Sequence, residues 1–160
     1  IGIQLGDALR YIHSRGLIHG DIKPGNVFIK DRVIKLGDFS SITKLLSTMS
    51  YSRIPSTIGF RAPEQVYRDI RERAKELDVE NRIDVYQLAN TLLYMLTGES
   101  IDGEDVNDKL VAEKLEGIPH NELKRLIGTG LAVEPEKRPS AEELIKQLYV
   151  IYEKISGKSG

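Results

Sequence analysis

The chain has 160 residues, of which 40% are hydrophobic and 29% charged, and its formal net charge is −1. This balance is typical of one globular domain, and it excludes the bulk basic field that attracts nucleic acid or an anionic membrane. No apolar run approaches the roughly 20 residues of a membrane-spanning helix. Cys is absent, which excludes a disulfide framework and a thiolate metal site, and we expect a cytoplasmic protein.

A helix is predicted near the start of the chain, where apolar residues recur at i, i+3, i+4 and i+7 from Leu5 to Ile12. Arg15 and Gly16 supply the signals for its end. Two apolar runs follow, residues 27–29 and 33–36, and residues 30–32 can form the turn between them. This pattern predicts a small β-hairpin.

The rest of the chain is predicted to be mainly helical. Residues 40–57 are rich in Ser and Thr without strong periodicity and indicate a loop, and residues 84–97, 106–115 and 121–131 are predicted helices. Ser140 and Glu143 have the spacing of a capping box that opens a last helix. The prediction is therefore a mainly α fold with a small hairpin, in one domain of residues 1–155 followed by a flexible tail, 156–160.

Residues 65–82 are heavily charged. Their simplest interpretation is a solvated helix or an insertion. A docking surface for a partner protein is the alternative.

Four polar residues around the hairpin carry the chemistry of the chain. Asp21 and Lys23 lie on the loop that enters it, and Asn26 and Asp38 flank its open end. An Asp can orient a hydroxyl and receive its proton, a Lys can contact a phosphate, and Asn and Asp oxygens are ligands for Mg²⁺. These residue types are those required for phosphoryl transfer from a magnesium nucleotide.

The motifs around these residues resemble those of the C-terminal lobe of eukaryotic-type Ser/Thr protein kinases. Residues 19–26 read HGDIKPGN and resemble the catalytic loop H-R-D-L-K-x-x-N, and residues 38–40 read DFS and resemble D-F-G. Residues 62–64 are A-P-E unchanged, residues 84–89 resemble D-x-W-x-x-G, and residues 134–139 resemble D-P-x-x-R-P. The motifs occur in the family's order, and the resemblance covers roughly residues 3 to 152. It implies a kinase-like α+β lobe.

The resemblance implies roles for the four polar residues. Asp21 corresponds to the catalytic base, whereas its alternative is a turn residue bonded to local backbone. Lys23 would contact the transferring phosphate, and a Lys at this position indicates Ser/Thr rather than Tyr phosphorylation. Asn26 and Asp38 would bind the metal, and the alternative for Asp38 is a cap at the end of a strand. The implied cofactors are ATP and Mg²⁺, with Mn²⁺ as the other metal, and the implied partner is a protein substrate.

Other residues are implied to support the site. In the family, the His at the position of His19 packs on the Phe of D-F-G, here Phe39, and hydrogen-bonds to the Asp of the central helix, here Asp84. Asp84 would cap the catalytic-loop backbone from inside the lobe. Glu64 and Arg138 are expected to form a buried ion pair.

Two further residues would contact the reactants. Thr57 lies where the family has the Thr that reaches the catalytic Asp and Lys. Phe28 lies where the family has a residue beneath adenine, and packing in the core is its alternative.

The chain departs from the family pattern in three ways. Gly20 replaces the Arg of H-R-D, so regulation by a phosphate paired with that Arg is not expected. Ser40 replaces the Gly of D-F-G and makes a backbone flip there more costly. Nothing in the chain resembles the Gly-rich loop, strand Lys or helix Glu of the kinase N-terminal lobe, so we expect that lobe to lie outside these 160 residues and the chain alone to be inactive.

Two other functions stay open. The H-G-D triplet also occurs in aminoglycoside-type phosphotransferases, but these generally lack the A-P-E and R-P segments. A non-catalytic pseudokinase or interaction module is the third hypothesis.

Overall fold

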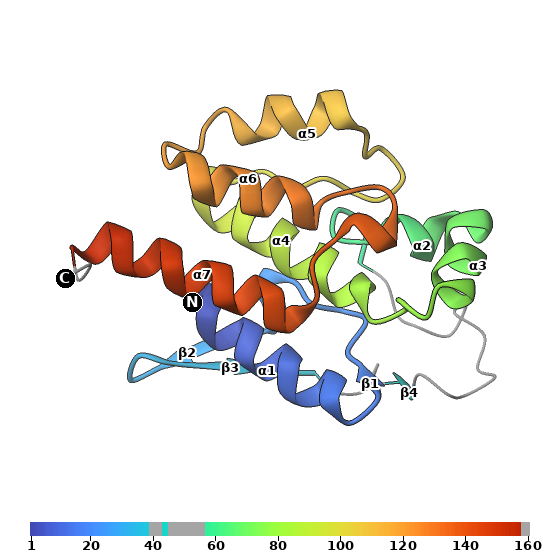
Figure 1. The fold of residues 1–160 in the computed structure, drawn as a ribbon, viewed down its shortest axis with the longest axis horizontal. Coiled ribbons are helices and arrows are strands. Elements are labelled where there is room, and N and C mark those ends of the chain that lie inside the picture. Colours follow the sequence, from blue (N-terminus) through green and yellow to red (C-terminus); the bar gives the residue numbers. More distant parts are fainter. Residues whose placement is uncertain (39–42, 45–56, 158–160) are drawn as a thin grey trace.

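A single buried helix, α4 (Arg82–Thr97), runs through the middle of the molecule (Figure 1). The structure is a computed structural model that describes residues 1–38, 43–44 and 57–157. Every residue of α4 from Ile83 to Thr91 is buried, as its mostly apolar sequence predicts. The helix ends at Gly98, which has a left-handed backbone with φ of 77°.

The first and last helices pack side by side below α4 in Figure 1. The first helix, α1 (Gly2–Ser14), buries Leu5, Leu9 and Ile12, the apolar face predicted from the sequence. The last helix, α7 (Ala141–Ser156), begins with the predicted capping box, in which the Ser140 hydroxyl accepts a bond from the Glu143 backbone N–H. Its end lies one residue inside the predicted tail.

The remaining helices are short. The α5–α6 pair lies on the other side of α4 from α1 and α7 (Figure 1), and α6 packs directly on α4. The helices predicted at 84–97, 106–115 and 121–131 are confirmed with shifts of one or two residues at their ends, whereas α2 was not predicted. Their bounds are α2, Pro63–Val66, α3, Arg68–Glu76, α5, Asp108–Leu115, and α6, Asn121–Gly130; two 3₁₀ turns, η1 and η4, cover Pro24–Asn26 and Pro135–Lys137.

The predicted hairpin consists of β2 (Val27–Lys30) and β3 (Val33–Leu36), which pair antiparallel. Its turn is shorter than expected, because Lys30 pairs with Val33 and only residues 31 and 32 lie between the strands. A second antiparallel pair, β1 (Leu17–Ile18) with β4 (Thr43–Lys44), was not predicted. The interpretation of residues 40–57 as a loop is therefore wrong at 43–44.

The core is divided by α4 into two clusters. Val85 and Leu88 face the first cluster, with α1, α7 and the base of the hairpin. Tyr86 and Ala89 face the second, with α5 and α6. Because α4 is apolar on both sides, it fixes both halves of the lobe relative to each other, and the mainly α fold class is confirmed.

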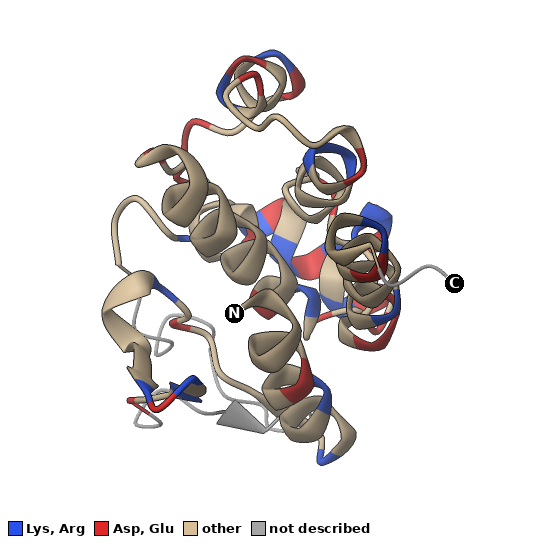
Figure 2. Ribbon diagram, turned by 90° about the vertical axis from the view of Figure 1, so that its left-hand side faces the viewer, with Lys and Arg blue, Asp and Glu red and all other residues tan. Residues whose placement is uncertain are grey.

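The charged stretch 65–82 forms α3, a helix whose Ala74 is fully buried while most of its charged side chains are exposed. In the view of Figure 2, Lys and Arg alternate with Asp and Glu along the described helices. Among the described residues, none of the helices combines the length and apolar character needed to cross a bilayer.

Candidate functional site

The loop predicted to be catalytic, residues 19–26, lies between β1 and β2, and side chains of α4 bind its main chain. The Asp84 carboxylate accepts hydrogen bonds from the backbone N–H of His19 at 2.9 Å and of Gly20 at 2.8 Å. Ile22, 1% exposed, anchors the loop in the core. The fully buried Asp84 carboxylate is thus satisfied by N–H donors, as a buried charge requires.

Two histidines fix this arrangement. The expected bond between His19 and Asp84 comes from the His19 main chain, whereas its ring accepts from the Asp21 N–H at Nδ1 and binds the Gly37 carbonyl through Nε2. In this arrangement Nδ1 is the accepting nitrogen of the His19 ring and Nε2 the donating one. His13, which the sequence analysis did not single out, binds Asp84 Oδ2 at 2.7 Å through its Nε2.

Asp21, Lys23 and Thr57 converge on one point. The Lys23 ammonium donates to the Thr57 hydroxyl at 2.6 Å and lies 3.5 Å from the Asp21 carboxylate. The Thr57 hydroxyl donates to Asp21 Oδ1 at 3.0 Å. Asp21 is 6% exposed and its loop is anchored by buried neighbours, so its carboxylate has a defined orientation at the edge of the lobe.

Asn26 and Asp38 lie at the open end of the hairpin. The Gly37 backbone N–H donates to the Asn26 carbonyl at 2.7 Å, which puts Asp38 directly beyond the last paired residues. The Asn26 side chain donates its amide to the Asp21 carbonyl at 2.8 Å, so the side-chain oxygen is the atom suited to a metal. Asp38 is exposed and has φ of 50°.

This donor set fits Mg²⁺. Within the described ranges, no three His, Cys, Asp or Glu side chains form a metal-binding group. Mg²⁺, however, commonly takes one or two protein oxygens and completes its shell with phosphates and water. One Asn oxygen and one Asp at a strand edge match that requirement.

Phe28 points away from the core. Its side chain is 57% exposed, so the alternative of core packing is wrong for this residue. A Cβ placed on Gly37 would overlap the Phe28 ring, which shows that the ring lies against the backbone that precedes Asp38. Phe39 and Ser40 lie outside the described residues.

Glu64 and Arg138 form a buried, two-point ion pair. Arg138 Nη1 and Nη2 lie 2.7 Å and 2.9 Å from the two Glu64 carboxylate oxygens. Arg138 also donates to the carbonyls of Ala132, Arg82 and Val133. The pair joins the start of α2 to the segment before α7.

The segment that carries Thr57 is held by residues that sequence reasoning missed. The Asp102 carboxylate accepts from the Gly59 N–H at 2.6 Å and from Arg61 Nη2 at 2.7 Å. Burial raises the pKa of Asp102, but the bonds from Arg61 and from backbone N–H groups outweigh it and leave the pKa below its usual value. Asn90 of α4 donates to the Gly59 carbonyl at 3.0 Å. For Asn90 the signal available in the sequence was a polar residue within an apolar stretch, whereas Asp102 lies among other polar residues and had no such signal.

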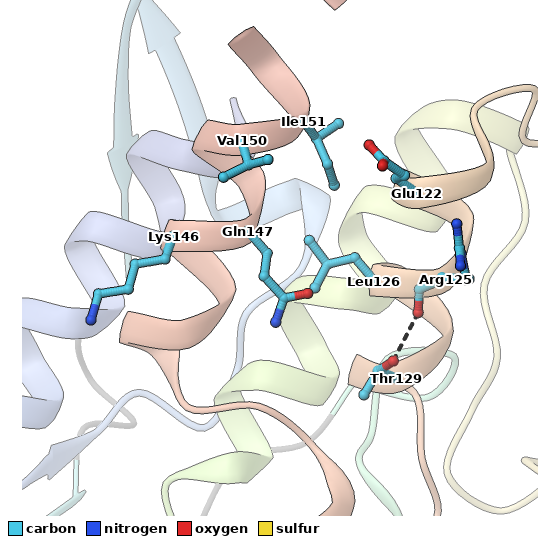
Figure 3. Close-up of a pocket in the computed structure, with 8 residues that line it drawn as sticks. All are labelled: Glu122, Arg125, Leu126, Thr129, Lys146, Gln147, Val150 and Ile151. Atoms are coloured by element: carbon cyan, nitrogen blue, oxygen red, sulfur yellow. Dashed lines mark hydrogen bonds between the residues drawn. The ribbon is translucent and has the colours of Figure 1, made fainter. Parts of the chain in front are cut away.

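A cleft of about 460 Å³ lies between α6 and α7, outside the groups described above. Figure 3 shows Gln147 and Ile151 of α7 facing Leu126 of α6. Two of its charged side chains are paired, Glu122 with Lys154 and Lys146 with Glu142, and Arg125 also lines it. None of the site residues predicted from the sequence lines this cleft.

Comparisons with known proteins show which proteins this chain is similar to. Residues 1–150 match the model of the protein kinase domain. The chain is 29% identical over 158 residues to a Wee1-like protein kinase of Arabidopsis thaliana, covering 96% of the chain and 29% of that protein. It is 33% identical over 147 residues to the interferon-induced, double-stranded RNA-activated protein kinase of Mus musculus, covering 91% and 28%. It is 32% identical over 162 residues to the serine/threonine-protein kinase SBK1 of Mus musculus, covering 91% and 38%. The chain thus spans between 28% and 38% of the length of these relatives.

Proposed function

This chain belongs to the family of protein kinase domains, and from that premise we propose that the intact protein transfers the γ-phosphoryl group of ATP to Ser and Thr hydroxyls of protein substrates. The observation that carries the proposal is the convergence of Asp21, Lys23 and Thr57 within hydrogen-bond distance. Catalysis by such a site consists of positioning and electrostatic stabilisation.

Asp21 is the proposed catalytic base. Its carboxylate accepts a bond from the Thr57 hydroxyl at 3.0 Å, so the carboxylate is accessible to a hydroxyl group. A substrate Ser or Thr would present its hydroxyl to the same carboxylate, which orients it and receives its proton. Lys23, 3.5 Å from Asp21, would stabilise the negative charge of the transferring group.

Asn26 and Asp38 are the proposed metal ligands. Mg²⁺ bound there would neutralise charge on the phosphates of ATP. The exposed ring of Phe28 would contact one face of the adenine. His19 positions the pair indirectly, because its ring binds the carbonyl of Gly37 next to Asp38.

We also propose that the second half of the nucleotide site comes from outside these 160 residues. The matched region covers only 28% or 29% of the length of two of the relatives. The chain alone would then be inactive.

The experiment compares the intact protein with its Asp21→Asn variant. We expect the variant to lower kcat on Ser- or Thr-containing peptides about 10²- to 10⁴-fold while the KM for ATP changes little, because Asp21 acts on the hydroxyl. Asp31→Asn, the same substitution in the exposed hairpin turn, is the matched control and should keep wild-type kcat.

Three outcomes would reject parts of this proposal. Full activity of Asp21→Asn would reject Asp21 as the base. Transfer to an aminoglycoside but not to peptides would favour the small-molecule phosphotransferase. Absence of transfer to any acceptor would favour the non-catalytic module.

A further inference from the structure

A buried glutamine on α4 binds the main chain on both sides of Asp21. The Gln87 side-chain amide donates to the Gly20 carbonyl at 2.8 Å, and its oxygen accepts from the Ile22 N–H at 2.9 Å. Gln87 is 1% exposed. One planar amide therefore contacts both peptide units that flank Asp21.

A second glutamine extends this contact to α2. The Gln65 side chain donates to the same Gly20 carbonyl at 3.0 Å, and its oxygen accepts from Gln87 at 2.9 Å. The same oxygen accepts from the Ala62 N–H at 2.8 Å. The two amides thus form a continuous path of hydrogen bonds from the main chain that enters α2 to the main chain at Asp21.

The geometry of Gly20 makes this path a constraint on Asp21. Gly20 has φ of 81°, in the left-handed region, and its N–H is bound by Asp84 while its carbonyl receives both glutamine amides. Buried hydrogen bonds of this kind define one arrangement, because any alternative leaves polar groups unpaired. The Asp21 side chain is therefore attached to a backbone with both neighbouring peptide groups fixed.

The path ends in the segment that carries Thr57. Residues 57–62 precede α2, and Gly59 is fixed by Asp102 and Asn90. Thr57 in turn binds Asp21. The segment and the catalytic loop are consequently joined twice, once through the Thr57 hydroxyl and once through the two glutamines.

We propose that Gln65 and Gln87 are positioning residues for phosphoryl transfer. They keep the Asp21 carboxylate at a fixed position relative to residues 57–62. This inference rests on the proposed function of Asp21. The glutamines act only through the main chain of the loop, since their bonds to the loop reach Gly20 and Ile22 and none of them reaches the Asp21 carboxylate. The link consists of neutral amides, so it needs no charged side chain at position 20.

The test measures kcat and KM of the intact protein with Gln87→Met, which keeps the side-chain length and removes both bonds to the loop together with the bond to Gln65. We expect kcat to fall at least about tenfold, with KM for ATP within about threefold, because a displaced base affects transfer rather than nucleotide binding. Gln4→Met is the matched control. Gln4 also binds main chain at two points, the Arg32 carbonyl and the Ile34 N–H, but on the hairpin, and its loss should leave kcat within about twofold.

A double-mutant cycle separates positioning from general destabilisation. In the Asp21→Asn background, Gln87→Met should lower the residual kcat less than about twofold, since the group that it positions is already absent. Gln65→Met should give a smaller loss of kcat, and its combination with Gln87→Met should be less than additive, because both amides bind Gly20. If Gln87→Met does not fold, Gln65→Met, at a half-buried position, carries the same cycle.

Hydrogen exchange on the intact protein gives a readout that needs no activity. Gln87→Met should increase the exchange rate of the Ile22 amide at least about tenfold relative to that of Leu88 in the middle of α4. Wild-type kcat in Gln87→Met, or an equal loss of kcat in the wild-type and Asp21→Asn backgrounds, would overturn the positioning role. Absence of peptide phosphorylation by the wild type would instead reject the proposed function, so the two failures are distinguishable.

Discussion

Of the four acidic side chains buried among the described residues, the three other than Asp21 differ in their hydrogen-bond donors. Asp84 accepts N–H bonds from the catalytic loop and from His13, whereas Glu64 faces the guanidinium of Arg138. Asp102 combines both, with Arg61 and two backbone N–H groups as its donors. Each acid lies where two distant segments meet. Each of these three carboxylates therefore marks a junction between segments that depends on its hydrogen-bond donors.

The junction at Asp102 should make stability depend on pH. The pKa of Asp102 lies below its usual value in the folded chain, so its stabilisation is complete above the unfolded value of about 3.9 and is lost as pH falls through the folded pKa. We expect Asp102→Asn to lower the free energy of unfolding by about 1.5–3 kcal/mol at pH 7, the range for a bond to a charged group. Urea unfolding at pH 7, 5, 4 and 3 measures this.

The difference between wild type and Asp102→Asn should shrink below about pH 4, because protonated Asp102 no longer pairs with Arg61. Glu104→Gln is the control, because it removes the other acid that pairs with Arg61. The Glu104 side chain is 63% exposed, so its loss should change the free energy of unfolding much less. A difference that stays constant down to pH 3 would contradict the role of the Asp102 charge.

At the scale of elements, the Glu64–Arg138 pair connects α2 to the start of α7. Both side chains are fully buried, so Arg138→Met would leave an uncompensated carboxylate and should cost about 3–5 kcal/mol of unfolding free energy. Denaturant-induced unfolding measures the loss. Arg73→Met, which breaks the exposed pair of α3 with Glu136, should cost less than about 1 kcal/mol.

The double variant Glu64→Met with Arg138→Met distinguishes charge burial from lost packing. It should be more stable than Arg138→Met alone, because the buried charge is removed together with its partner. A double variant less stable than either single one would show that packing and the carbonyl bonds of Arg138 dominate instead.

The elements predicted from the sequence are those with strong local signals. The 3.6-residue periodicity of α1 and the capping box of α7 are properties of neighbouring residues, so they could be read without knowledge of the fold. The strands β1 and β4 have two residues each, too few for any periodicity. Their pairing depends on contacts between Leu17 and Lys44, 27 positions apart by number, and no local pattern encodes it.

The same distinction applies to the site. Asp21, Lys23 and Asn26 lie within one short motif, and their neighbourhood could be predicted from spacing. His13 and Gln87 could not, because each meets its partner, Asp84 or Ile22, across 71 or 65 positions of sequence. In the sequence such residues cannot be told apart from other polar residues, because only the fold brings each of them to its buried partner.

At the scale of the whole molecule, one face of the proposed nucleotide site is open. Phe28 is 57% exposed, and Val33, which lies on the same face of the hairpin, is 51% exposed. Ligand sites of useful affinity bury about 70–90% of the ligand surface. A flat apolar strand pair beside Asn26 and Asp38 supplies only one wall of such a site.

We therefore expect the 160-residue chain alone to bind Mg-ATP with a Kd weaker than about 100 µM, since a single wall recovers little of the free energy that binding requires. Isothermal titration calorimetry of the chain, with the intact protein measured alongside, tests this expectation. The intact protein should bind more tightly, and Asp38→Asn should weaken that binding by removing a metal ligand. A micromolar Kd for the isolated chain, lost in Asp38→Asn, would demonstrate that these residues form a complete nucleotide site by themselves.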